Sequence, residues 1–197
     1  MAKRAKTQET AELGKRVTEA LLKVVGDIPR SKEEPSENPA GRAEELTKRA
    51  ALDAAVISGG LALPAGPLAL LTLIPDLLLM WKRQAKLVAD MAAAYGKSRD
   101  LSQNVLLYCL FRHTASEAVR TLTVPAGDEV VLKRSTVKTL KRVAAAAGVR
   151  VAQRLLRRQF ARVIPVLGIV GVAGYAYYDT AQVGETALEF LKGKKRR

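Results

Sequence analysis

The stretch AAVISGGLALPAGPLALLTLIP, residues 54–75, holds no charged side chain in 22 positions. A membrane-spanning helix needs roughly 20 apolar residues, so the stretch is long enough to cross a bilayer. However, Pro64 and Pro67 each remove a backbone donor and push the preceding residue out of helical geometry. We therefore predict two short helices joined by a turn at PAGP, which form an apolar hairpin and not a single span.

A second uncharged run covers residues 163–178. Fully helical, it would be about 24 Å long, shorter than the roughly 30 Å hydrocarbon core of a bilayer. Lysine and arginine flank both runs on both sides, which places all their ends on the cytoplasmic side of a membrane. Three environments stay open: the core of a helical bundle, shallow or hairpin insertion into lipid and, least favoured, a true membrane span. The residues predicted for these roles are Leu61, Leu63, Pro64, Pro67, Leu68, Leu70, Leu71, Leu73, Ile74, Trp81, Val166, Leu167, Ile169, Val170 and Tyr175.

Glycines recur in both runs. Gly168, Gly171 and Gly174 are spaced by three in GIVGVAG, and Gly59 and Gly60 lie in the first run. Each glycine costs a helix roughly 1 kcal/mol relative to alanine, and close helix packing can offset that cost. We predict that these five glycines let the two apolar runs pack closely together.

The net charge is +14, and its distribution is uneven. Ten basic and no acidic residues lie between Lys133 and Arg162, and five more basic residues lie in the last six positions. Such segments predict a polyanionic partner, either anionic lipid or a phosphate backbone. The predicted contact residues are Arg134, Lys138, Lys141, Arg142, Arg150, Arg154, Arg157, Arg158 and Arg162.

Anionic membrane lipid is the preferred partner, because the basic segment leads directly into the apolar run at Val163. The segment also has few aromatic or amide side chains for contacts to bases. Non-specific binding of nucleic acid by a soluble helical protein is the alternative.

Hydrophobic spacing predicts four parts: an amphipathic helix over 1–28, a flexible proline-containing linker over 29–41, a helical domain over 42–192 and a basic tail over 193–197. Helices are expected over 43–57, 76–95, 102–122, 129–162 (one bent helix or two) and 180–191. Asp76 should cap the second of these and Gly96 should end it. The fold class is all-α, a bundle of about 6–8 helices around the two apolar hairpins. The start of the chain lacks the apolar segment of a secretory signal, so a cytoplasmic location is expected.

Motifs for catalysis or metal binding are weak. His113 and Glu117 lie one helical turn apart, but His113 is the only histidine and Cys109 the only cysteine. A metal site needs three or four ligands, and a catalytic triad needs an acid behind its histidine. The segment MAAAYGKS lacks the first glycine of a phosphate-binding loop. We predict no enzyme activity, no metal and no cofactor.

Two segments resemble the EcsC family. They are ALPAGPLALLTLIPDLLLMWKRQAKLVADMAAAYG and RVIPVLGIVGVAGYAYYDTAQVGETALEFL, and the resemblance covers roughly residues 43 to 192. The positions that match the family pattern are Gly59, Gly60, Pro75, Asp76, Tyr95, Gly96, Ile164, Pro165, Gly168 and Gly171. The resemblance implies a helical, membrane-associated bacterial protein, peripheral or partly inserted at the cytoplasmic face. It also implies an accessory role beside an ABC transporter or secretion process, and a homo-oligomer is left open.

Overall fold

The computed structural model describes residues 2–60, 69–126, 129–132, 136–159 and 165–193. These residues form seven α-helices, one 3₁₀ helix and one β-hairpin, so the all-α fold class is confirmed apart from the hairpin. The elements are α1 (Ala2–Gly26), α2 (Pro39–Gly60), α3 (Ala69–Ala94), η1 (Ser98–Asp100), α4 (Gln103–Phe111), α5 (Ser116–Arg120), β1 (Thr123–Ala126), β2 (Glu129–Leu132), α6 (Val137–Gln159) and α7 (Pro165–Lys192).

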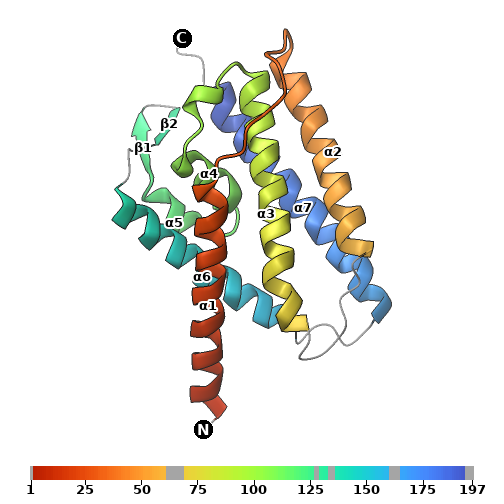
Figure 1. The fold of residues 1–197 in the computed structure, drawn as a ribbon, viewed down its shortest axis with the longest axis vertical. Coiled ribbons are helices and arrows are strands. Elements are labelled where there is room, and N and C mark those ends of the chain that lie inside the picture. Colours follow the sequence, from red (N-terminus) through yellow and green to blue (C-terminus); the bar gives the residue numbers. More distant parts are fainter. Residues whose placement is uncertain (1, 61–68, 127–128, 133–135, 160–164, 194–197) are drawn as a thin grey trace.

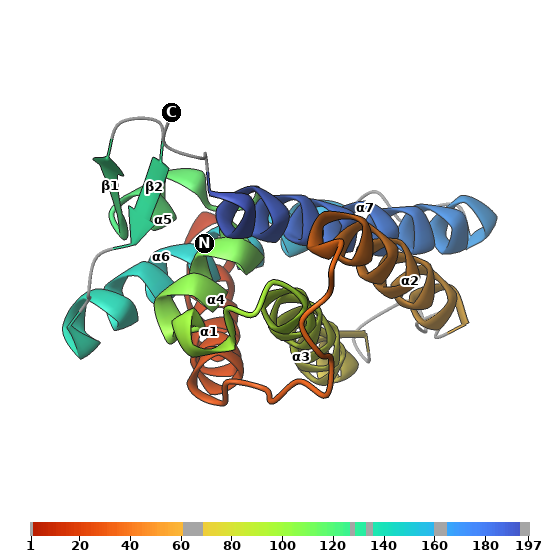
Figure 2. The same ribbon diagram turned by 90° about the horizontal axis from the view of Figure 1, so that it is seen from above.

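The long helices form two packed groups (Figures 1 and 2). In one group α2 packs most extensively on α7, and α3 contacts both of them. In the other group α1 packs on α6. Helix α2 runs antiparallel to α3 and α7, as the colours of Figure 1 show. Helix α4 contacts α1, α3, α6 and α7 and so joins the groups.

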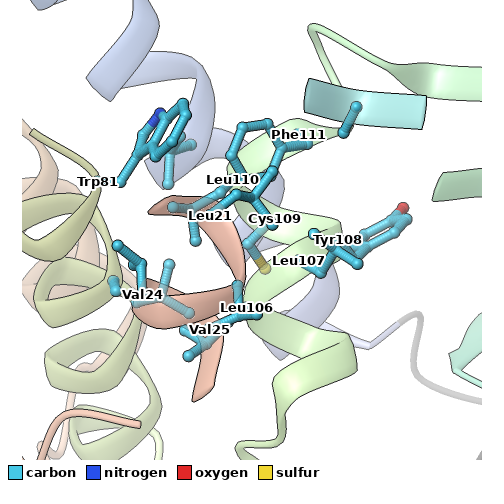
Figure 3. Close-up of a cluster of buried hydrophobic side chains, with 14 of the residues drawn as sticks. Leu21, Val24, Val25, Trp81, Leu106, Leu107, Tyr108, Cys109, Leu110 and Phe111 are labelled. Atoms are coloured by element: carbon cyan, nitrogen blue, oxygen red, sulfur yellow. The ribbon is translucent and has the colours of Figure 1, made fainter. Parts of the chain in front are cut away.

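Helix α4 lies at the centre of the core because it is apolar on every side. All seven residues from Val105 to Phe111 are buried. In Figure 3, Leu106 to Phe111 lie beside Leu21, Val24 and Val25 of α1, and the rings of Trp81 on α3 and Phe111 form an edge-to-face pair with centroids 5.2 Å apart. The hydroxyl of Ser102 accepts a hydrogen bond from the backbone N–H of Val105 and so caps the helix, which decides between Asp100 and Ser102, the two caps that the sequence allows.

Helix α1 is part of the same core, which corrects the prediction of a separate amphipathic helix. Its buried side chains meet α3, α4 and α6. They recur every three or four residues, at Leu13, Val17, Leu21, Val24 and Val25.

The linker after α1 is held against the bundle, contrary to the predicted flexible tether. The backbone N–H of Ser36 donates to the carbonyl oxygen of Ala94 at 2.9 Å. The carboxylate of Glu33 forms an ion pair with the guanidinium group of Arg42 on α2, with Oε1 and Nη2 2.9 Å apart. Nearby, the ammonium group of Lys97 donates a hydrogen bond to the carbonyl oxygen of Leu191 at 2.7 Å. This bond links the C-terminal ends of α3 and α7.

The two arms of the predicted hairpin are present as antiparallel helices that are longer than expected, whereas its turn at PAGP lies outside the described residues. Its first arm α2 ends at Gly60 and its second arm α3 begins at Ala69. Pro75 lies inside α3, where it removes one donor without ending the helix, so Asp76 is an interior residue and not a cap. Gly96, with φ of 67°, ends the helix region as predicted, and its N–H donates to the carbonyl of Ala93.

Three more boundaries differ from the sequence predictions. Residues 129–132 pair with β1 in an antiparallel hairpin, with Val124 opposite Val131, so the basic helix begins only at Val137. Helix α6 is then continuous past Gly148. Helix α7 is likewise one helix and not an apolar run followed by a separate amphipathic helix.

Candidate functional site

Three helix ends without charged residues gather at one end of the molecule. They are residues 54–60 of α2, 69–75 of α3 and 165–178 of α7, and together we name them the charge-free end. In Figure 1 these ends lie together at the lower right, opposite the C-terminus. They gather there because α2 runs antiparallel to both α3 and α7.

Large apolar side chains are exposed at and beside this end. Val56 on α2 is 73% exposed and Leu52, one turn earlier, is 58% exposed. On α7, Tyr178 is 59% exposed and Tyr177 is 40% exposed. Contiguous exposed apolar patches mark interaction sites, and these four side chains lie on two helices that pack on each other.

A groove of about 500 Å³ lies between α2 and α3, with α7 contributing to its wall. Its apolar lining includes Ala50, Ala54 and Ile57 from α2, and Leu79 and Met80 from α3. The volume falls within the roughly 300–1,000 Å³ typical of small-molecule sites. The lining extends to Ser58, less than one turn from the end of α2, so the groove reaches the charge-free end.

Basic residues line the groove farther from that end. Arg49 on α2, with Lys82, Arg83 and Lys86 on α3, belongs to the lining. Lys86 forms an ion pair with Asp90, and Arg49 lies 3.9 Å from Glu45. Lys82 and Arg83 have no ion pair among the described residues, and both are exposed.

Asp76 is the acidic residue of the groove nearest to the start of α3. Burial raises the pKa of its carboxyl group. Its Oδ2 atom is buried and has no hydrogen-bond partner among the described residues. Both observations follow from the partial burial of this carboxyl group in the groove wall.

Behind the groove lies a buried polar cluster, which we name the Asp179 network. The Asp179 carboxylate on α7 accepts hydrogen bonds from Gln84 Nε2 at 2.9 Å, from His113 Nε2 at 2.8 Å and from the Tyr175 hydroxyl at 2.9 Å. Gln84 Nε2 also donates to Thr180 Oγ1 at 3.2 Å, and Thr180 lines the groove.

The environment of Asp179 favours its charged form. Burial acts to raise the pKa of this carboxyl group. The hydrogen bond and charge of His113 and the hydrogen bonds from Gln84 and Tyr175 act in the opposite direction. Together they outweigh the effect of burial, so the pKa of Asp179 lies below its usual value. The network therefore joins α3, α7 and the turn after α4 through one buried anion.

This network was not predicted from sequence, although it gives His113 an acidic partner. A catalytic triad would also need a nucleophile on the other ring nitrogen. His113 Nδ1 is buried without a hydrogen-bond partner among the described residues. The available signal was Asp179 itself, a lone acid directly after an uncharged run of a helix.

The predicted basic contact residues divide by position. Lys138, Lys141, Arg142 and Arg154 are exposed on α6. Arg150 instead forms an ion pair with Glu117 on α5. Arg157 and Arg158 lie on α6 without described side chains, and Arg134 and Arg162 lie outside the described residues.

The predicted apolar residues divide in the same way. Trp81 is 3% exposed, so it is a core residue and not an interfacial one. Ile74 is half-buried against the core, and Tyr175 is half-buried in the Asp179 network. Leu70, Leu71, Leu73, Val166, Leu167, Ile169 and Val170 lie on helices, but their side chains are not described. Leu61, Leu63, Pro64, Pro67 and Leu68 lie outside the described residues.

The glycines predicted to pack closely do not show that contact where they can be examined. A Cβ built at Gly171 or Gly174 would meet no described atom within 4 Å. The surroundings of Gly59, Gly60 and Gly168 are not described. Close approach occurs elsewhere: a Cβ at Gly184 would lie 2.3 Å from Thr47 Cγ2, and one at Gly148 would lie 3.1 Å from the Gly14 carbonyl oxygen.

The described side chains offer little reactive chemistry. Cys109 is buried, and burial raises the pKa of its thiol to about 12. No group of three or more potential metal ligands occurs in the described part of the chain. Among the helices that the structure describes, none is both long and apolar enough to span a bilayer.

Comparisons with protein-family models, curated proteins and solved structures give no match to this chain. The resemblance to the EcsC family therefore stays a prediction.

Proposed function

We propose that this chain docks on an anionic membrane surface, with its charge-free end in the lipid. The observation that carries the proposal is the convergence of three uncharged helix ends beside exposed apolar side chains. Nothing in this proposal requires catalysis. Membrane docking is the function for which the described geometry offers the most support.

The height of the charge-free end suits a shallow insertion. At 1.5 Å per residue, residues 54–60 and 69–75 each span about 10 Å, and residues 165–178 of α7 span about 21 Å, so α2 and α3 set the depth at which only uncharged helix ends would enter. Amphipathic elements that lie at a membrane interface bury their apolar part by about 5–10 Å. The exposed Tyr177 and Tyr178 lie where the uncharged part of α7 gives way to Asp179. Tyrosine favours this headgroup level of a membrane.

Basic residues lie near the same end and would attract anionic headgroups. Helix α1 begins at the low end of the molecule in Figure 1, with Lys3, Arg4 and Lys6 in its first two turns. Helix α6 descends toward that end as it approaches Gln159, and Arg154 is exposed on it. Each basic residue near an anionic leaflet contributes roughly 1 kcal/mol of attraction.

Two valines with similar exposure provide a matched test. Val56 at the charge-free end is 73% exposed, and Val137 at the distant start of α6 is 69% exposed. Val56→Asp should weaken co-sedimentation with phosphatidylglycerol vesicles at least tenfold, because an aspartate resists transfer into the interface. Val137→Asp introduces the same charge and should change binding less than threefold.

Salt dependence separates insertion from simple charge attraction. If the charge-free end inserts, part of the bound protein should remain on the vesicles in 1 M salt. At that salt concentration the Debye length is about 3 Å, so attraction between surface charges is largely screened. Equal effects of the two aspartate variants, or complete release by salt, would contradict insertion. Preferential binding to duplex DNA over vesicles would instead support the nucleic-acid alternative. The accessory role beside a transporter rests on the family resemblance alone and stays a prediction.

A further inference from the structure

The groove between α2 and α3 changes character along its length. Near the charge-free end its lining is formed by Ala54, Ile57, Leu79 and Val172. Farther along, Arg49, Lys82 and Arg83 join the lining. An amphiphile has the same arrangement, an apolar chain joined to a charged head.

The charges that are free to act favour an anion. Asp90 is paired with Lys86 and also accepts a hydrogen bond from Ser31 Oγ at 2.5 Å. Burial raises the pKa of Asp76, which lies toward the apolar part. The lining holds four basic side chains, Arg49, Lys82, Arg83 and Lys86, against three acids, Asp53, Asp76 and Asp90. Arg49 lies 3.9 Å from Glu45, whereas Lys82 and Arg83 have no ion pair among the described residues.

We propose that this groove binds one acyl chain of an anionic phospholipid. The chain lies along the apolar lining toward the charge-free end, and the phosphate is held by Arg49, Lys82 and Arg83. This proposal rests on the proposed membrane docking and adds a defined lipid site to it. A phospholipid would enter from the membrane side, because the groove extends to within one turn of the end of α2.

The polar groups behind the groove support a fixed shape. Thr180 lines it and accepts a hydrogen bond from Gln84, which is buried and also held by the carboxylate of Asp179. These bonds hold α3 and α7 in one arrangement. A lining held in this way loses little conformational freedom when a ligand binds.

The probe is a single-chain lipid used below its micelle concentration, so that no bilayer is present. Dodecanoyl lysophosphatidate should bind the full chain in a calorimetric titration. Dodecanoyl lysophosphatidylcholine, with the same chain and no net charge, should bind at least about tenfold more weakly. Inorganic phosphate alone should not compete, because without the chain it lacks the apolar contacts.

Charge reversal supplies the matched variants. Lys82→Glu with Arg83→Glu should weaken binding of the lysophosphatidate at least about tenfold, since two such contacts are each worth roughly 1 kcal/mol and 1.4 kcal/mol is tenfold. Lys15→Glu with Arg16→Glu makes the same charge change at two exposed positions of α1 outside the groove and should alter binding less than twofold. Ala50→Phe, which narrows the groove, should weaken both lysolipids. Circular dichroism checks that each variant is folded. If Ala50→Phe does not fold, the two charge variants alone still test the lipid site.

Equal affinity for the two lysolipids, equal effects of the two double variants, or no binding by the wild-type chain would overturn the lipid site. None of these results depends on vesicles. A chain that binds vesicles but not the lysophosphatidate would retain the proposed docking and lose only the groove proposal. A chain that binds the lysophosphatidate but not vesicles would retain the groove and lose the docking.

Discussion

Asp179 is the residue on which most of the buried polar contacts converge. It is 5% exposed, and its carboxylate accepts from side chains on α3, on α7 and in the turn after α4. A buried charge of this kind stabilises a fold only while its partners remain in place. Because the folded pKa of Asp179 is lowered, its contribution is fully present above the unfolded pKa, about 3.9, and is lost as the pH falls through the folded value.

We expect Asp179→Asn to lower the free energy of unfolding by about 3 kcal/mol at pH 7. The difference from the wild-type chain should narrow as the pH falls below about 4, where the native carboxylate also becomes protonated. Urea unfolding at several pH values measures both effects. Asp27→Asn, at an exposed position, should change stability by no more than about 0.5 kcal/mol. A gap between Asp179→Asn and wild type that stays constant down to pH 2 would contradict this account.

Helix packing depends on two glycines that sequence reasoning did not select. Gly184 allows α7 to approach Thr47 on α2, and Gly148 allows α6 to approach Gly14 and Thr18 on α1. The regular spacing of Gly168, Gly171 and Gly174 drew attention because periodicity is visible in a sequence. Close approach at a single crossing point leaves no periodic signal, so only the assembled helices reveal it.

Two glycine-to-alanine changes on α7 should have opposite effects. Gly184→Ala places a Cβ 2.3 Å from Thr47 Cγ2, so we expect a loss of about 1–3 kcal/mol in stability through overpacking. Gly174→Ala meets no described atom within 4 Å and should gain up to about 1 kcal/mol from helix propensity.

Chemical denaturation of the two alanine variants measures the contrast. Adding Thr47→Ala to Gly184→Ala should recover part of the loss, because it removes Cγ2 and Oγ1 and leaves only Thr47 Cβ, 2.9 Å from the new methyl group. A Gly184→Ala variant as stable as the wild-type chain would show that α2 and α7 do not approach closely there.

At the scale of the whole molecule, α1 and the remaining helices form one unit. The apolar spacing of α1 and its buried face were readable from sequence, as were the helical hairpin and the ends of several helices. The sequence did not show that the rest of the bundle covers α1. Three prolines follow α1, and they are equally typical of a flexible tether and of an ordered segment that crosses the bundle. The β-hairpin was missed for a related reason: Val130 and Val131 are followed by basic residues that suggested the start of the next helix.

The single tryptophan makes this unity testable. Trp81 lies on α3, near Leu21 of α1 in Figure 3. Leu21 is fully buried, so Leu21→Ala should lower stability by about 2–5 kcal/mol and shift the unfolding transition reported by Trp81 fluorescence. Leu52→Ala, a change at a residue that is 58% exposed, should shift it by no more than about 0.5 kcal/mol. A Trp81 transition unmoved by Leu21→Ala would mean that α1 unfolds independently.

The contacts of Ser36, Arg42 and Lys97 all lie at the end of the bundle opposite the charge-free end. These contacts fix the start of α2 and the ends of α3 and α7, while the charge-free end of α2 lies about 33 Å away at 1.5 Å per residue. The polar and ionic ties of the chain termini are thus spatially separate from the surface proposed to meet lipid, so either end can be altered without changing the contacts of the other.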